Sequence, residues 1–155
     1  MSYHYAECGL DYVYLENGYA YHDTAYGKGV AIAHLDGLHA AIGKWVIEQP
    51  AALRGAELRF LRLEIELTQR GLADILGTTE QTLRLWEKGH GKAIPGPADR
   101  LLRALYLEFL DRAGGVREMV ERLAKADSQR RPVARMRETR RGWTAKSEFA
   151  EAVVT

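Results

Sequence analysis

The chain has 155 residues, of which 46% are hydrophobic, so it is long enough for one ordinary domain or two small ones around a packed core. The formal net charge is only +1, and the single cysteine, Cys8, excludes an internal disulfide and a cysteine-based zinc finger. No apolar run is long enough to span a bilayer and the first residues lack the order of a signal peptide, so we expect a cytoplasmic protein without a membrane partner.

The small net charge conceals an acidic beginning and a basic end. Residues 1–48 contain two lysines and six carboxylates, a formal charge of −4. Residues 127–146 contain seven cations and two carboxylates, a formal charge of +5. This asymmetry is compatible with nucleic-acid contact at the basic end, although a solvated or disordered end would have the same composition.

The first third of the chain alternates large apolar residues with small or polar ones, as half-buried strands do. The alternation is visible in YHYAEC, YVYLEN, YAYHD and GVAIA. Asn17-Gly18 separates two of these runs and is a typical two-residue hairpin turn, and Gly27-Lys28-Gly29 predicts another turn. We therefore expect a small antiparallel sheet.

A helical pattern follows the strands. Apolar residues recur at helical spacing from Leu38 to Val46, with Asp36 placed to cap the helix N-terminus. Pro50 stops this helix, so the stretch from Gln49 to Leu53 is the expected boundary between two halves of the chain. We predict that residues 1–49 are an α+β module in which one helix covers the sheet.

After the boundary the pattern predicts five short helices. In chain order these are one carrying Leu58, Leu61 and Ile65, one from Thr68 to Gly77, one from about Thr79 to Lys88, one over about Ala98 to Arg112, and one from Val116 to about Ala126. The fold class is therefore α+β, with the N-terminal module followed by an all-α five-helix domain over residues 53–126. Residues 127–155 have few apolar positions, and we expect a basic, flexible tail mostly without regular structure.

The stretch from Leu67 to Gly89 is the most informative part of the sequence. Its apolar positions are spaced so that two helices can bury them against each other, and Gly77 suits the left-handed residue that closes a helix. The Thr78-Thr79 pair is expected to cap the next helix, with Gln81 completing a capping box on Thr78. Two helices joined by a tight turn, the second one directed outward, form a helix-turn-helix.

These residues resemble two known groups of proteins. Leu67-Thr68-Gln69, Leu72-Ala73, Leu76-Gly77 and Trp86-Glu87-Lys88-Gly89 are similar to the helix-turn-helix of the Cro and lambdoid phage repressor superfamily. Gly55 to Arg62, Ile94-Pro95 and Ala98 to Arg103 resemble the C-terminal domain of MqsA-type (YgiT-type) antitoxins. The resemblance covers about Leu53 to Leu110. It does not extend to the two Cys-x-x-Cys pairs of the N-terminal zinc domain in those antitoxins, because this chain has only Cys8.

The resemblance implies a set of DNA contacts. Gln69 would meet a phosphate at the positive end of its helix, and the next helix would present its polar face to the bases. There Gln81 would pair with adenine, Arg84 with guanine or phosphate, and Leu85 with a thymine methyl group, whereas the lysines would hold phosphates. The full predicted set is Gln69, Thr79, Glu80, Gln81, Arg84, Leu85, Lys88 and Lys92. Arg62 and Glu87 match a structural ion pair of the family and are expected to have no DNA role.

We predict a sequence-specific DNA-binding transcription regulator, a homodimer that binds a palindromic operator in double-stranded DNA and, as the resemblance implies, represses its own operon. A helix-turn-helix that serves only protein contact is the competing interpretation of this segment. Two further hypotheses concern the N-terminal module. It would bind a toxin protein if the chain is an antitoxin, or a small molecule if the chain is a ligand-sensing regulator.

Three other features of the sequence bear less strongly on function. Seven of the eight tyrosines lie within residues 3–26, where they predict either aromatic cross-strand pairs or a surface for a partner. His4, Cys8 and His22 could reach one metal, but nothing fixes that geometry, so we predict no metal and no cofactor. No nucleophile, base and orienting acid can be assembled from the sequence, so we predict that the protein is not an enzyme.

Overall fold

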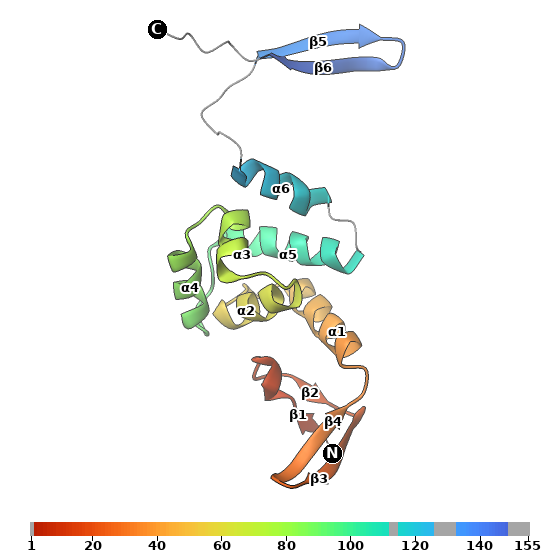
Figure 1. Cartoon of the computed structure of the whole chain (residues 1–155), viewed down its shortest axis with the longest axis vertical. Helices are drawn as coiled ribbons and strands as arrows, with labels where there is room; N and C mark the ends of the chain where they lie inside the picture. The colour runs from red at the N-terminus through yellow and green to blue at the C-terminus, as the bar shows by residue number, and fades with distance from the viewer. Residues whose placement is uncertain (1, 112–114, 126–132, 149–155) are drawn as a thin grey trace. The chain divides into compact units, whose positions relative to one another are not determined.

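The computed structural model describes residues 2–111, 115–125 and 133–148, and the chain divides into two compact units, residues 1–124 and 125–155 (Figure 1). The described residues form six α-helices, one short 3-10 helix and three two-stranded antiparallel sheets. A mixed α+β fold is therefore confirmed. The first unit holds the helices and two of the sheets, and the second unit holds the third sheet.

Two separate strand pairs form the N-terminal part of the first unit. β1 (Tyr3–His4) pairs with β2 (Tyr14–Leu15) around the 3-10 helix η1 (Ala6–Cys8), and β3 (Tyr19–Thr24) pairs with β4 (Gly27–Ile32). The prediction of a single small sheet is therefore wrong. The cause is the position of the turns, because neither predicted hairpin turn lies where a hairpin forms.

Asn17-Gly18 connects β2 to β3, two strands that do not pair, and the hairpin turn of β3–β4 is Ala25-Tyr26 instead of Gly27-Lys28-Gly29. Thr24 closes this turn, since its Oγ1 accepts a hydrogen bond from the Tyr26 N–H at 3.2 Å and donates one to the Gly27 carbonyl at 2.6 Å. Gly27 has a φ of +118°, a conformation that favours glycine. Local side-chain bonding thus fixes the turn two residues before the predicted one.

Helix α1 (Leu35–Glu48) follows the second strand pair directly. Its N-cap is His34, in a left-handed conformation and without a side-chain cap bond, whereas Asp36 lies in the first turn and not at the predicted cap. Gly43 faces α5 (Gly96–Asp111), where a Cβ would lie 2.0 Å from the Tyr106 hydroxyl oxygen. The missing side chain therefore lets α1 lie close against α5.

One hydrophobic core runs through the first unit. Its buried members come from the N-terminal loops, from α1 and from the helices that follow, and they include Tyr5, Leu10, Leu15, Ile42, Val46, Leu53, Leu58, Leu61, Leu72, Leu83, Leu102 and Tyr106. The boundary predicted between residues 49 and 53 therefore does not separate two cores.

The segment at that boundary is fastened to α5 by Arg103. Its guanidinium donates hydrogen bonds to the carbonyls of Ile47 at 3.0 Å, Gln49 at 2.5 Å and Ala51 at 2.6 Å, and it also pairs with Asp99. Asp99 in turn accepts from the Leu53 N–H at 2.7 Å. Burial raises the pKa of the Asp99 carboxyl, but the bonds from Arg103 and Leu53 outweigh burial and hold this pKa below its ordinary value. We call this arrangement the Arg103 strap.

Five helices follow the segment that the Arg103 strap fastens: α2 (Gly55–Glu64), α3 (Gln69–Leu76), α4 (Glu80–Lys88), α5 and α6 (Gly115–Lys125). The N-terminus of α6 is capped by Glu108, whose carboxylate accepts from the N–H groups of Val116 at 2.7 Å and Arg117 at 2.9 Å. A carboxylate at this end of a helix satisfies free N–H groups and complements the helix dipole.

The second unit contains a hairpin that sequence inspection missed. β5 (Val133–Thr139) pairs with β6 (Gly142–Glu148) over seven residues each, so the expected tail without regular structure is wrong for these residues. Residues 127–132 and 149–155 of the predicted tail lie outside the described residues. The turn is Arg140-Arg141, and Thr139 closes it with the same pair of bonds that Thr24 makes in β3–β4.

Candidate nucleic-acid interface

α3 and α4 are joined by a short turn whose ends are both capped. Thr68 Oγ1 accepts from the Gly71 N–H at 2.9 Å to begin α3, and Gly77 closes that helix with a φ of 74°. Thr79 then begins α4 by accepting from the Thr82 N–H at 3.1 Å. The cap on α4 is thus Thr79 with Thr82, and not the predicted box between Thr78 and Gln81.

Arg62 and Glu87 form a buried ion pair that sets the position of α4. Arg62 Nε and Nη2 each donate to a different carboxylate oxygen of Glu87 at 2.9 Å, and its Nη1 donates to the Leu67 carbonyl at 2.9 Å. The two side chains are 10% and 5% exposed. Because a planar guanidinium and a carboxylate fit in one orientation, the pair fastens α4 to α2 and to the loop before α3.

A second close contact holds the end of α4. A Cβ at Gly55 would lie 2.2 Å from the Trp86 carbonyl oxygen. Only glycine at position 55 therefore allows the N-terminus of α2 to lie this close to the end of α4. The Gly55 and Ala56 N–H groups also donate to the carbonyls of Lys92 and His90. The loop that carries Lys92 is therefore held in place by α2.

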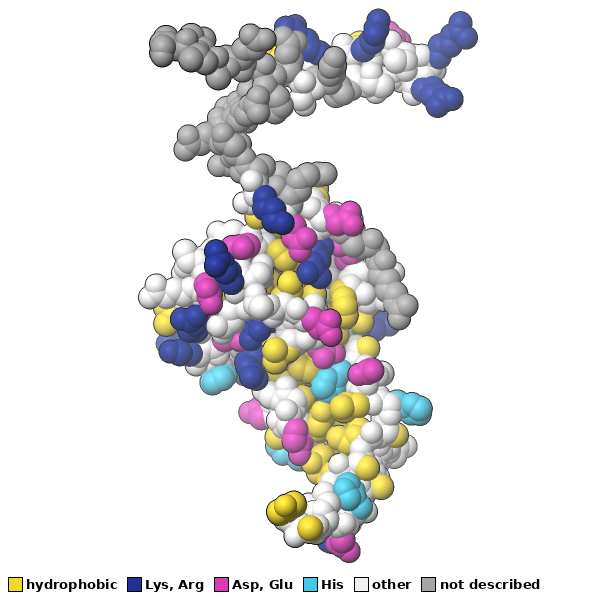
Figure 2. All heavy atoms as spheres, viewed as in Figure 1, with side chains coloured by type: hydrophobic (Ala, Val, Ile, Leu, Met, Phe, Trp, Pro, Cys, Tyr) yellow, Lys and Arg dark blue, Asp and Glu magenta, His cyan; other side chains and the backbone are white. Residues whose placement is uncertain are grey.

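The outer face of α4 consists of the residues predicted to face DNA. Leu83 and Glu87 are buried, while the exposed residues are Glu80, Gln81, Arg84, Leu85 and Lys88. Leu85 is 60% exposed and is the apolar member of this face. Lys92 is exposed in the loop that follows, and Figure 2 shows Lys and Arg side chains around α4.

Three predicted residues meet at one point on this face. Arg84 donates from Nη2 to a Glu80 carboxylate oxygen at 3.1 Å and from Nε to the Gln69 amide oxygen at 3.4 Å. Gln69 is the first residue of α3, so the cluster joins the starts of both helices. The Arg84 guanidinium thus lies between the Glu80 carboxylate and the Gln69 amide. The sequence alone does not predict this position.

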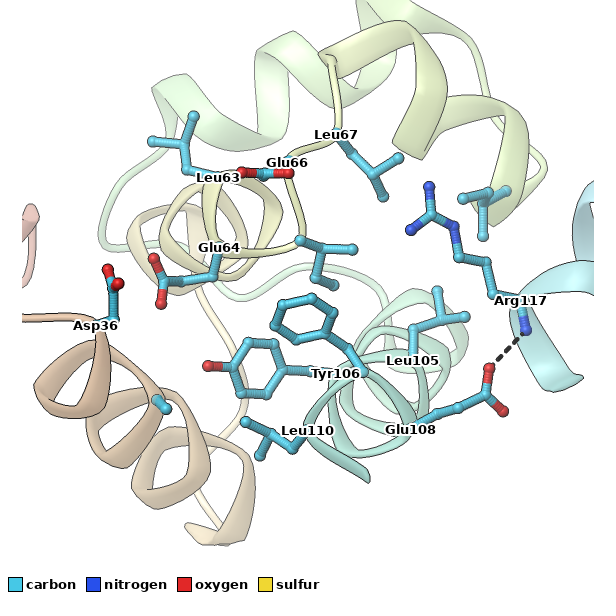
Figure 3. Close-up of a pocket in the computed structure, with 14 residues that line it drawn as sticks. Asp36, Leu63, Glu64, Glu66, Leu67, Leu105, Tyr106, Glu108, Leu110 and Arg117 are labelled. Carbon is cyan, nitrogen blue, oxygen red and sulfur yellow. Dashed lines mark hydrogen bonds between the residues drawn. The ribbon is translucent and has the colours of Figure 1, made fainter. Parts of the chain in front are cut away.

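The first unit also has a groove of 790 Å³ lined by α1, α2, α3, α5 and α6 (Figure 3). Tyr106 lies on its floor with its hydroxyl directed toward α1, buried and without a hydrogen-bond partner. Burial, together with the nearby Glu64 charge, raises the pKa of Tyr106 to about 12. The carboxylates of Asp36, Glu64 and Glu66 line the rim. None of the residues predicted to contact DNA lines this groove.

Two of the three N-terminal residues considered for a metal, His4 and Cys8, make other contacts. His4 stacks on Tyr14 and its Nε2 lies 2.7 Å from the Asp11 carbonyl, and Cys8 Sγ donates to the Tyr5 carbonyl at 3.2 Å. Among the described residues, no group of three or more His, Cys, Asp or Glu side chains is arranged to hold a metal ion. No helix in the described part of the chain is both long and apolar enough to cross a membrane.

Comparison of the chain with models of protein families, with curated proteins and with solved structures finds no match. What this site can do therefore has to follow from its own residues and their geometry.

Proposed function

We propose that the protein is a DNA-binding transcription regulator in which α4 enters the major groove. The supporting observation is the capped turn between α3 and α4, together with the buried pair of Arg62 and Glu87 on the side of α4 opposite its exposed, mostly polar face. A helix held this way can follow a groove that is about 12 Å wide. Resemblance to Cro-type regulators leads to the same function.

Each exposed residue then has a chemical role. Gln81 pairs with adenine through its amide, and Leu85 touches a thymine methyl group. Arg84 exchanges its bond to Glu80 for a guanine edge or a phosphate, and Glu80 keeps the guanidinium extended until DNA arrives. Lys88 and Lys92 hold phosphates, which fixes register without reading sequence.

A palindromic operator requires two copies of the chain, one helical turn apart. Apolar side chains remain exposed on α5 and α6, namely Leu107, Phe109, Val116 and Met119. We propose that these side chains form the two-fold contact and that the protein represses its own operon.

The test is a binding titration against the DNA upstream of the gene, with a scrambled duplex as control and salt as the variable. Arg84→Ala should reduce the preference for the operator by about 1–3 kcal/mol, whereas Gln69→Ala should weaken both duplexes alike. Lys44→Ala, an exposed charge on α1, is the matched control and should change neither. Equal, weak binding of the unmodified protein to both duplexes would contradict the proposal.

A second candidate, an antitoxin, is favoured by the N-terminal surface. Tyr14, Tyr21, Tyr26 and Trp45 are exposed there, in the acidic third of the chain. Exposed aromatic side chains are enriched in protein interfaces. Co-purification with the product of an adjacent gene, lost on Trp45→Ala and Tyr14→Ala, is the expected result. In this case DNA binding would be the autoregulatory half of the same protein.

A further inference from the structure

The β5–β6 hairpin has two chemically different faces. Alternate residues of a strand share a face, so Arg135 and Arg137 lie on one side, whereas Met136 and Trp143 lie on the other. Arg140 and Arg141 form the turn at the tip. One side and the tip are therefore cationic, whereas the other side carries Met136 and Trp143 together with the carboxylate of Glu138, the cross-strand partner of Trp143.

The side chains of the hairpin whose exposure is described form no hydrophobic interior. Every one of its residues for which exposure is described is exposed, including Met136 at 56% and Trp143 at 68%. An isolated two-stranded hairpin is marginally stable in water. A hairpin of this kind gains stability from a surface that it binds, and its charges indicate the chemistry of that surface.

The charges favour a polyanion. Residues 133–148 contain five cations and two carboxylates, a net charge of +3, whereas the whole chain has a net charge of +1. Four of the five cations are arginines, whose planar guanidinium matches a phosphate with two parallel hydrogen bonds. Figure 2 shows Lys and Arg side chains projecting from the hairpin.

The dimensions of the hairpin also fit a nucleic acid. Seven residues per strand give a ribbon about 23 Å long, at roughly 3.3 Å per residue. A two-stranded ribbon is, with the α-helix, one of the two elements that the major groove of B-form DNA admits. A ribbon of this length can follow the backbone over about two-thirds of a helical turn of DNA.

From these observations we propose that the β5–β6 hairpin is a second nucleic-acid contact, in which Arg137, Arg140 and Arg141 hold phosphates of the DNA that α4 reads. The contact is independent of sequence, because phosphates carry no base information. This inference rests on the proposed function, since it places the hairpin on the DNA that α4 binds. It accounts for the basic charge at one end of the chain.

The test compares two double variants of the full chain. Arg140→Ala with Arg141→Ala removes two charges from the tip, and Lys28→Ala with Lys44→Ala removes two exposed charges from β4 and α1. Each lost phosphate contact makes the slope of log K against log salt shallower by about 0.9, so the tip variant should lose about 1.8 and the control almost nothing. Affinity for operator and scrambled duplex should fall by the same factor.

A third variant, Gly142→Ala, keeps every charge but introduces a Cβ at a φ of +111°, which strains the turn. It should weaken both duplexes if the arginines act from a folded hairpin, and unchanged affinity would overturn that arrangement. If the tip variant binds the operator as the unmodified protein does, with the same slope of log K against log salt, the inference is overturned and the role of α4 is left intact. If the unmodified protein binds both duplexes equally and the tip variant weakens both, the hairpin contact stands and the reading of bases by α4 fails.

Discussion

The hairpins β3–β4 and β5–β6 are built on the same turn. In each, a threonine is followed by two turn residues and a glycine: Thr24 to Gly27 in the first and Thr139 to Gly142 in the second. Both threonine hydroxyls accept from an N–H at 3.2 Å and donate to the glycine carbonyl. The two glycines have φ values of +118° and +111°. Four residues thus suffice to reverse the chain in both units of the molecule.

The two hairpins differ in what lies beside the turn. Tyr19 and Ile32 connect β3–β4 to the hydrophobic core, and the two charged residues of this hairpin, Asp23 and Lys28, cancel. β5–β6 belongs to the other unit, its side chains of described exposure are all exposed, and it carries a net charge of +3. The same turn therefore forms both hairpins, whereas the side chains on their strands differ in burial and in charge.

The largest expected effect separates the two hairpins. Arg62→Ala leaves the Glu87 carboxylate buried and unpaired, which should cost roughly 3–5 kcal/mol of unfolding free energy. Because β3–β4 belongs to the unit with that core and β5–β6 does not, only the first should lose its amide protection. Two-dimensional NMR of the variant would show this. Loss of the β5–β6 signals as well would contradict the division into two units.

A smaller effect comes from the turn glycines. A Cβ at such positive φ costs about 1–2 kcal/mol. Gly142→Ala should open β5–β6, which has no buried face to hold it, whereas Gly27→Ala should only lower the midpoint of thermal unfolding by a few degrees. Cross-strand NOEs in the two variants check this comparison. Equal tolerance in both hairpins would mean that β5–β6 has a stabilising contact of its own.

The smallest expected effect tests whether the turns are equivalent. Thr24→Val and Thr139→Val keep the side-chain shape and remove the two hydroxyl bonds, so each should destabilise its hairpin by about 1 kcal/mol. Temperature coefficients of the Tyr26 and Arg141 amide protons would report the loss. A clear difference between the two variants would show that only one turn depends on its threonine.

The two capped helices α3 and α4 could be predicted from the sequence because their signals are local. Thr68, Gly77 and Thr79 occupy cap positions that short-range hydrogen bonds define, and the structure has all three there. The Arg84 cluster could not be placed this way, since Gln69 is fifteen residues away and meets Arg84 only through the packing of α3 on α4. The DNA contacts themselves stay a prediction.

The errors in the fold have physical causes too. Asn17-Gly18 is a good hairpin signal, but Leu15 is buried in the core and β2 pairs with β1, so the chain turns there without forming a hairpin. The β5–β6 hairpin could not be predicted because the described side chains of its strands are all exposed, and strands without a buried face lack the apolar pattern that suggests a strand. In the first case tertiary contacts of β2 overrode the local turn signal, and in the second the strands formed without the apolar pattern that burial produces.

The Arg103 strap ties the segment before α2 to α5, which bears on where the first unit could be cut. A gene fragment that encodes only residues 53–110 would lose the carbonyls of Ile47, Gln49 and Ala51 and leave the Arg103 guanidinium with Asp99 as its single partner. A different segment joined before Pro50 would have to follow the same backbone path, because Arg103 bonds to main-chain carbonyls that every residue has. A fragment of the first unit that begins at Leu53 is therefore expected to be less stable than the whole unit, because it lacks these contacts to α5.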